Sequence, residues 1–303
     1  MAHVEVGFQS EALAEALSEA LRGKFARIED ALMRLGGMPT TPPKFKLAQA
    51  FGAEMGKASG QASELLNFLS QENSEPDHPR VYLPMAAAFG WAGRARAGRD
   101  VETAWQGLAF LAADERDPVR LATREALTAL CTLPGASDEL VSRAMAWLAL
   151  PDREERCNAS STMVEVLGDK KVLSQLKDAE ALFTYLSALL FELGEMPRSA
   201  ERSDGRRRVL QGMPRTFAQA VATFAASGEG PEWLDKECEG TRQPILREVL
   251  SATLVKLITS GGGVSAEVIE RSRAALKGSA KPPRDPTRIR KGAGRGARTR
   301  RIK

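Results

Sequence analysis

The sequence predicts an all-α protein, and three observations lead to that prediction. Alanine and leucine supply much of the 43% hydrophobic content, and both are strong helix formers. Aromatic residues make up only 6% of the chain, and no run of β-branched or aromatic residues alternates with polar ones as in a strand. Apolar residues recur every three or four positions in several segments, which is the spacing of one face of an α-helix.

The first predicted helix begins at Ser10, whose side chain suits an N-terminal cap, and carries an apolar face from Leu13 to Leu35. A glycine pair followed by Pro39 should end it, because glycine is favoured just past a helix end and proline cannot continue the helix. The stretch GAEMGKAS has only three residues between its glycines and no preceding strand, so it is not a phosphate-binding loop. Three further helices are predicted in this part of the chain, at residues 45–57, 61–70 and 81–91.

A helical hairpin is predicted around the stretch DERDPVRLATREALTALC. Asp100 is expected to cap its first helix, and a short charged turn at residues 113–116 ends that helix. Asp117 is then expected to cap the second helix, with Pro118 in the first position, where its missing N–H costs nothing.

A second hairpin follows, with Ser137 as the expected cap of its first helix and Gly168 at the end of its second. A shift of 36 residues places Arg120 on Arg156, and this period is typical of stacked helical hairpins.

The rest of the body is expected to be helical at 179–193, 215–226 and 243–259, with a last helix from Ser265 to about 277. A charged loop is expected at 194–205, and the insertion SGEGPEWLDKECEGT should separate the second and third of these helices. The chain is thus divided into a helical-repeat domain, residues 1–276, and a basic C-terminal tail, residues 277–303. The tail is rich in Pro, Gly and Arg without apolar periodicity, so we expect it to be disordered.

The segment ERDPVRLATREALTAL resembles a HEAT repeat. In that family an Asp often marks the turn between the paired helices, and an Arg near the start of the second helix meets the neighbouring repeat. Asp117 and Arg120 match this pattern. The resemblance is most specific over Asp100–Cys131 and extends through Gly168. It implies an α-solenoid of stacked antiparallel helical hairpins, of HEAT or armadillo-like type.

A narrower resemblance is to the DNA-alkylation-repeat family, HEAT-like solenoids that include alkylpurine DNA glycosylases. Those enzymes use aromatic residues and a catalytic Asp in a concave groove, and the counterparts here, by residue type only, are Trp105, Trp147, Asp114 and Asp152. Trp105 lies on the apolar face of its predicted helix, which favours a core position over base stacking. The two aspartates are most simply explained as polar residues of the turns.

Other chemistry finds little support in the sequence. The three cysteines, Cys131, Cys157 and Cys238, are far apart and odd in number, which argues against a disulfide framework and favours buried thiols in a reducing compartment. With two histidines in the whole chain, no zinc site or nucleophilic triad is indicated. We therefore expect no metal or cofactor, and a binding protein rather than an enzyme.

The sequence also indicates no membrane association. The N-terminal segment carries several glutamates and has no apolar core, so it is not a signal peptide. The longest apolar stretch, Leu182–Phe191, is shorter than the about 20 residues that a bilayer requires. We expect a cytoplasmic protein.

The charge of the chain is unevenly distributed. The tail holds 11 of the 43 Lys/Arg residues and one of the 39 acidic residues, a net charge of +10, which leaves 32 basic and 38 acidic residues, a net of −6, in the body. Such asymmetry indicates an interaction arm for a polyanion. Two Arg clusters on the body, GRARAGR and GRRRVL, add candidate phosphate contacts. The predicted nucleic-acid-binding residues are Arg284, Arg288, Arg290, Lys291, Arg295, Arg298, Arg300, Arg301 and Lys303 of the tail, and Arg94, Arg96, Arg99, Arg206, Arg207 and Arg208 of the body.

These observations predict a non-enzymatic helical-repeat protein that engages DNA or RNA through its basic tail and the Arg clusters. Two alternatives stay open at this point. One is a repair enzyme of the alkylpurine DNA glycosylase kind, and the other is a scaffold for a protein partner in which the tail is incidental. The sequence does not indicate the oligomeric state.

Overall fold

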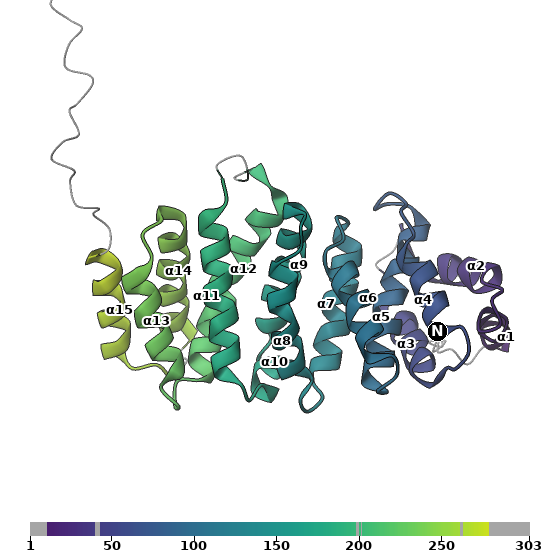
Figure 1. Ribbon diagram of the computed structural model, residues 1–303, viewed down its shortest axis with the longest axis horizontal. Helices are drawn as coiled ribbons and strands as arrows, with labels where there is room; N and C mark the ends of the chain where they lie inside the picture. Colours follow the sequence, from purple (N-terminus) through teal and green to yellow (C-terminus); the bar gives the residue numbers. More distant parts are fainter. Residues whose placement is uncertain (1–10, 40–42, 198–199, 201, 261–262, 279–303) are drawn as a thin grey trace, which may run out of the picture.

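The computed structural model describes residues 11–39, 43–197, 200, 202–260 and 263–278. Over these residues the chain forms fifteen α-helices, one short 3-10 helix and no β-strand (Figure 1). The predicted all-α fold class is therefore confirmed. The helices are α1 Glu11–Ala20, α2 Ala26–Leu35, α3 Phe45–Lys57, α4 Ala62–Ser70, η1 Pro79–Val81, α5 Tyr82–Arg96, α6 Val101–Ala112, α7 Asp117–Cys131, α8 Ala136–Leu148, α9 Arg153–Leu167, α10 Lys170–Gln175, α11 Ala179–Glu195, α12 Asp204–Thr223, α13 Glu229–Gly240, α14 Pro244–Ser260 and α15 Ala266–Gly278.

The helices lie side by side along the long axis of the molecule, with α1 and α2 at one end and α15 at the other (Figure 1). A first row consists of α3, α5, α7, α9, α12 and α14, each packed against the next. A second row consists of α4, α6, α8, α11, α13 and α15, in which α4 packs on α6 and the last four pack in succession. Most helices of the second row also contact the neighbouring first-row helix in the chain, so the apolar core lies between the two rows.

The amphipathic pattern of α7 explains how the rows hold together. Its residues Val119, Ala122, Ala126, Leu127 and Leu130 are all buried, as their spacing predicts. The small alanines among them allow α5 and α9 to approach on both sides. The remaining face of the helix carries most of its charged residues.

The first predicted helix is divided in two by Gly23. This glycine adopts φ +90°, a left-handed conformation that other residues rarely take. The chain turns there, so that α1 and α2 pack against each other instead of continuing as one helix. The spacing from Leu13 to Leu35 is preserved across the turn, which is why the sequence pattern alone predicts one helix. The expected cap Ser10 lies outside the described residues.

The region from 194 to 241 differs from the sequence prediction. The helix expected at 215–226 begins earlier, at Asp204 within the expected charged loop, and ends at Thr223 as α12. Ser203 caps it by accepting a hydrogen bond from the backbone N–H of Arg206 at 3.0 Å. The charges of this stretch hide the helix, because they leave no apolar spacing at its start.

The expected insertion is also helical and forms α13. Its Trp233 is buried, stacks on Phe183 with ring centroids 5.2 Å apart, and meets the edge of Phe217 at 5.1 Å. A single buried aromatic thus anchors a helix whose many acidic residues disguise its apolar face.

Three expected helix caps have other roles. The Asp100 carboxylate accepts hydrogen bonds from Ser63 and Arg94 rather than from its own helix. Ser137 lies inside α8, with its hydroxyl within 2.9 Å of the Cys131 carbonyl. Asp117 lies inside α7 as its first residue, so Arg116 stands at the cap position, and the Asp117 carboxylate pairs with two arginines. By contrast, Ser265 does accept a hydrogen bond from the N–H of Val268, at 3.3 Å, as predicted.

Glycines allow a close helix contact between α3 and α5. A Cβ added to Gly93 would collide with the carbonyl of Gly52, and one added to Gly56 would lie 2.7 Å from the Gly93 carbonyl. The stretch GAEMGKAS therefore supplies a helix crossing in which backbone meets backbone. Within the described part of the chain, no helix combines the length and the apolar character needed to cross a membrane.

Candidate nucleic-acid interface

A groove runs along the first row of helices. It consists of three adjoining hollows of about 690, 590 and 470 Å³. The first two share Arg124, Glu165 and Arg208 in their linings, and the second and third share Arg215 and Lys256. The lining comes from α7, α9, α10, α12 and α14 and from loop residues, with no contribution from the described helices of the second row.

Positively charged residues outnumber acidic ones in this groove. Its lining holds six Lys/Arg residues (Arg120, Arg124, Lys170, Arg208, Arg215 and Lys256) and four acidic residues (Asp117, Glu125, Glu165 and Asp169). Among the described residues, those that line the third hollow include no acidic one. The body as a whole has a net charge of −6. The groove therefore concentrates positive charge locally.

The side chains of three of these cations form no ion pair or hydrogen bond within the described part of the chain. Lys170 of α10, Arg215 of α12 and Lys256 of α14 are all exposed, and together they line the third hollow. Next to them lie the hydroxyl groups of Thr223, Thr259 and Ser260. Each of these hydroxyls donates to a carbonyl of its own helix, so the exposed cations are the groups that could contact phosphate oxygens.

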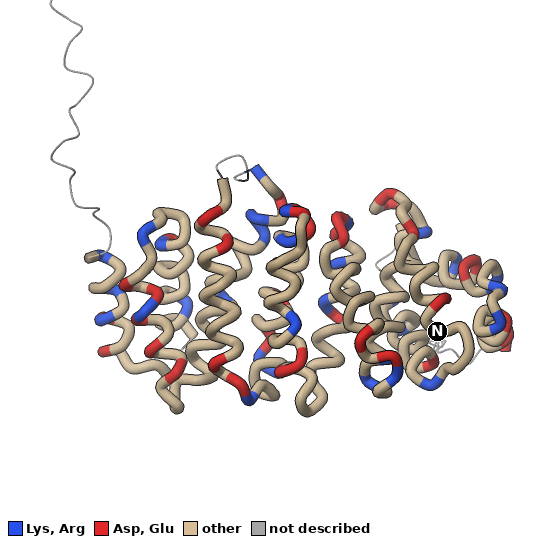
Figure 2. The backbone as a smooth tube through the Cα atoms, viewed as in Figure 1, with Lys and Arg blue, Asp and Glu red and all other residues tan. Residues whose placement is uncertain are grey.

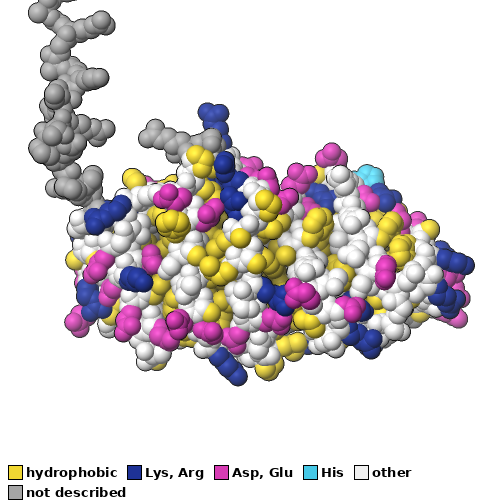
Figure 3. All heavy atoms as spheres, in the orientation of Figure 1, with side chains coloured by type: hydrophobic (Ala, Val, Ile, Leu, Met, Phe, Trp, Pro, Cys, Tyr) yellow, Lys and Arg dark blue, Asp and Glu magenta, His cyan; other side chains and the backbone are white. Residues whose placement is uncertain are grey.

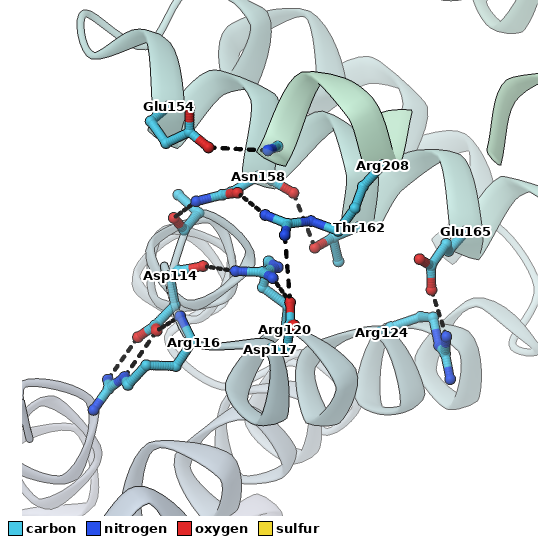
Figure 4. A network of polar contacts seen from close by, with 12 residues as sticks. Asp114, Arg116, Asp117, Arg120, Arg124, Glu154, Asn158, Thr162, Glu165 and Arg208 are labelled. Atoms are coloured by element: carbon cyan, nitrogen blue, oxygen red, sulfur yellow. Dashed lines mark hydrogen bonds and ion pairs between the residues drawn. The ribbon is translucent and has the colours of Figure 1, made fainter. Parts of the chain in front are cut away.

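The other end of the groove contains a polar network at the start of α7, α9 and α12 (Figure 4). Arg116 and Asp114 form a bidentate ion pair, with Nε to Oδ1 at 2.9 Å and Nη2 to Oδ2 at 2.6 Å, and both side chains are buried. Arg208 donates to Asn158 Oδ1 at 2.7 Å. The Glu154 carboxylate accepts from the N–H of Gly205 at 3.0 Å, which ties the start of α12 to α9.

Arg120 connects this network to the groove. Its Nη1 donates to the carbonyl of Asp114 at 2.5 Å, and its Nη2 faces Asp117 as an ion pair. Burial and the neighbouring charge of Arg208 lower the pKa of Arg120 to about 10, so the guanidinium stays charged at neutral pH.

The contact of Arg120 recurs at the start of α9. Arg156, which aligns with Arg120 after the 36-residue shift, donates from Nη1 to the carbonyl of Leu150 at 2.5 Å. In both cases the acceptor lies six residues earlier, in the turn before the helix. The sequence match between Arg120 and Arg156 therefore corresponds to an equivalent contact.

The predicted Arg clusters of the body lie in different environments. Arg94 is buried and bonds to the carbonyls of Met55 and Ala58, both at 3.2 Å, so it joins the C-terminal ends of α3 and α5. Arg99 also donates to the Ala58 carbonyl at 3.2 Å. Arg96 is exposed. None of the three lines the groove, so this cluster is not brought together with the one at the start of α12.

The second cluster is divided among three roles. Arg208 lines the groove, Arg206 is buried, and Arg207 is exposed and paired with Asp204. Clustering in the sequence therefore identifies one groove residue here. It misses Lys170, Arg215 and Lys256, because each of these is a groove cation from a different helix. The predicted tail residues, Arg284 through Lys303, lie outside the described residues.

The counterparts of the glycosylase residues have structural roles. Trp105 and Trp147 are buried, and the guanidinium of Arg143 lies 5.4 Å from the ring centre of Trp105. Asp152 caps α9 by accepting from the N–H of Glu155 at 2.9 Å, and Asp114 belongs to the buried ion pair. Neither tryptophan lines the groove, so neither offers it a ring on which a base could stack.

The cysteines are buried and unpaired, as predicted. Burial raises the pKa of Cys131 and of Cys238 to about 12 and that of Cys157 to about 11, so all three remain protonated thiols. Among the described residues, no group of three His, Cys, Asp or Glu side chains is arranged to hold a metal ion.

Comparison with protein-family models, with curated proteins and with solved structures finds no match to this chain. Its function is therefore inferred from the geometry of the groove and from the charge of the chain.

Proposed function

We propose that this is a non-enzymatic helical-repeat protein, an α-solenoid of HEAT or armadillo-like type, that binds nucleic acid along the groove and through its basic C-terminal tail. The two rows of helices and the equivalent contacts of Arg120 and Arg156 support the repeat interpretation. The observation that carries the function is the hollow lined by Lys170, Arg215 and Lys256, three cations that have no acidic partner among the described residues.

Charge that is left uncompensated favours the binding of phosphate. Figure 2 shows Lys, Arg, Asp and Glu distributed over the whole length of the body, and many of the arginines are paired with carboxylates. The three groove cations attract phosphates without first breaking such an ion pair. Contacts of this kind bind the backbone of DNA or RNA with little sequence preference.

The experiment compares two triple variants with the same change in net charge. The groove variant carries Lys170→Gln, Arg215→Gln and Lys256→Gln, and the control carries Lys46→Gln, Lys177→Gln and Lys236→Gln, which are exposed and lie outside the groove. Fluorescence anisotropy measures the affinity for labelled single-stranded and duplex oligonucleotides at several salt concentrations. We expect the groove variant to bind at least about tenfold more weakly at low salt, with a reduced salt dependence. Equal affinities of the two variants would refute the groove as the binding surface.

The alternative function as a protein scaffold is favoured by a different observation. Helices α6 and α11 of the second row expose Phe110 and Phe191, at 57% and 70% of their surface. Figure 3 shows apolar side chains interspersed with charged ones over one face of the molecule. Large exposed aromatics are enriched at protein interfaces. Replacing both by serine would leave oligonucleotide binding unchanged if the groove is the nucleic-acid interface.

A further inference from the structure

One carboxylate of the polar network is shared by two arginines (Figure 4). Asp117 Oδ1 forms an ion pair with Nη2 of Arg120, and it lies 3.6 Å from Nη1 of Arg208. The two guanidinium groups come from α7 and α12. Asp117 is therefore the carboxylate that pairs with both guanidinium groups, while the charges of Asp114, Glu154 and Glu165 also act on Arg120.

The two arginines and the aspartate differ in how firmly they are held. The Arg120 side chain is only 5% exposed and is fixed by the Asp114 carbonyl, and Arg208 is fixed by Asn158. The Asp117 side chain is 76% exposed, and it lies at the first residue of α7. The cations are thus fixed by the fold, whereas their counter-charge can rotate into solvent.

The arginines also have unused hydrogen-bonding capacity. The Nε of Arg208 is buried and has no acceptor among the described residues. Arg120 and Arg208 both line the hollow of about 690 Å³, together with Arg124, Glu165 and Ser161. This volume lies within the range of small-molecule sites in proteins, about 300–1,000 Å³.

We propose that Arg120 and Arg208 form a binding site for a phosphate group, and that Asp117 occupies this site until a phosphate displaces it. A phosphate offers more acceptor oxygens than a carboxylate, and planar guanidinium groups bind it through paired hydrogen bonds. Asp117 is then an internal competitor, which lowers the affinity for weakly held anions. The phosphate belongs either to a nucleic-acid backbone, in which case the inference rests on the proposed function, or to a free nucleotide.

The test uses Asp117→Asn, which removes the competing charge and keeps the size of the side chain. The matched control is Glu115→Gln, an exposed neighbour with the same charge change that pairs with neither arginine. Isothermal titration calorimetry measures the affinity for inorganic pyrophosphate and for adenosine monophosphate, and anisotropy measures the affinity for an oligonucleotide. Asp117→Asn should tighten pyrophosphate binding by about tenfold, the equivalent of about 1.4 kcal/mol. Glu115→Gln should change it by less than about twofold, because screening weakens exposed charges at a distance.

A double variant shows whether the gain acts through the arginines. In the background of Arg208→Gln, the Asp117→Asn change should no longer improve binding. The inference is overturned if pyrophosphate does not bind, if both single variants give the same gain, or if the gain persists without Arg208.

The set of ligands that respond identifies the source of the phosphate. If Asp117→Asn raises the affinity for pyrophosphate and for the oligonucleotide, the site binds the nucleic-acid backbone. If it raises the affinity for pyrophosphate and the mononucleotide but not for the oligonucleotide, the site binds a free nucleotide. If the groove triple variant loses oligonucleotide binding while Asp117→Asn has no effect on any ligand, this site is refuted and the proposed function stands without it.

Discussion

At the scale of single residues, the arginines of this protein include buried structural groups and exposed groups that face the groove. Arg116 is of the first kind, since its guanidinium is buried, pairs with Asp114 and also donates to the carbonyl of Ser74 at 3.1 Å. The hydrogen bonds and charge of Asp114 raise the pKa of Arg116 above its usual range. Arg215 is of the second kind, exposed at the groove and unpaired within the described part of the chain. The sequence around an arginine does not show whether it is buried or exposed, because burial depends on which helix packs above the side chain.

Replacing Asp114 by asparagine should destabilise the fold strongly. The change leaves the buried charge of Arg116 without its counter-charge, and breaking a buried pair in this way costs about 3–5 kcal/mol. Urea denaturation followed by circular dichroism measures the loss, with Glu115→Gln as the exposed control, for which we expect a change within about 0.5 kcal/mol. A catalytic aspartate would behave differently, because its replacement would abolish base excision while the stability stayed the same.

At the scale of helices, the contact between α3 and α5 shows how close packing depends on glycine. The carbonyl of Gly52 lies where a side chain at Gly93 would begin, and the carbonyl of Gly93 faces Gly56 in the same way. Glycine within a helix costs roughly 0.5–1 kcal/mol relative to alanine. The close approach of the two helices offsets that cost, because it lets them bury large side chains such as Phe51 and Met55.

The change Gly93→Ala should therefore destabilise the protein, although alanine is the better helix former. The new methyl group meets backbone, which cannot move aside as a flexible side chain would, so the two helices must separate. We expect a loss of about 1–3 kcal/mol or more, the range for overpacked cores. The control is Gly240→Ala at the end of α13, where an added Cβ meets nothing within 4 Å and little change is expected. If both variants unfold at the same urea concentration, the two helices are not in backbone contact.

The helices could be predicted from the sequence wherever the apolar spacing is unbroken, as in α3, whose bounds match the prediction. Prediction failed where a charged stretch is helical, since DGRRR at the start of α12 lacks an apolar pattern and Pro214 lies inside that helix. Of the six groove cations, only Arg208 was among the binding residues predicted from the sequence. Lys170, Arg215 and Lys256 are far apart in the sequence, and only the packing of the helices brings them to one hollow. Local periodicity thus determines single helices, whereas the site depends on contacts between them.

At the scale of the whole molecule, charge is divided between a body of net −6 and a tail of net +10. The body should on average repel a polyanion, so binding by the groove requires that its local excess of cations outweighs the surrounding acidic residues. The tail has a single acidic residue, so almost nothing within it repels a polyanion. The two elements should therefore contribute differently, the groove by positioning a bound strand and the tail by long-range attraction that salt screens.

Removal of the tail tests this division. A protein truncated after Gly278 keeps all described helices and the groove, so its thermal stability should be nearly unchanged. Its affinity for single-stranded oligonucleotides should fall sharply at low salt, and the slope of log affinity against log salt should become less steep by about 0.7 for each phosphate that the tail no longer binds. The residual binding should disappear when Lys170, Arg215 and Lys256 are also replaced by glutamine. Equal affinities and slopes for the full and truncated chains would mean that the tail binds no phosphate, and all of the binding would then belong to the groove.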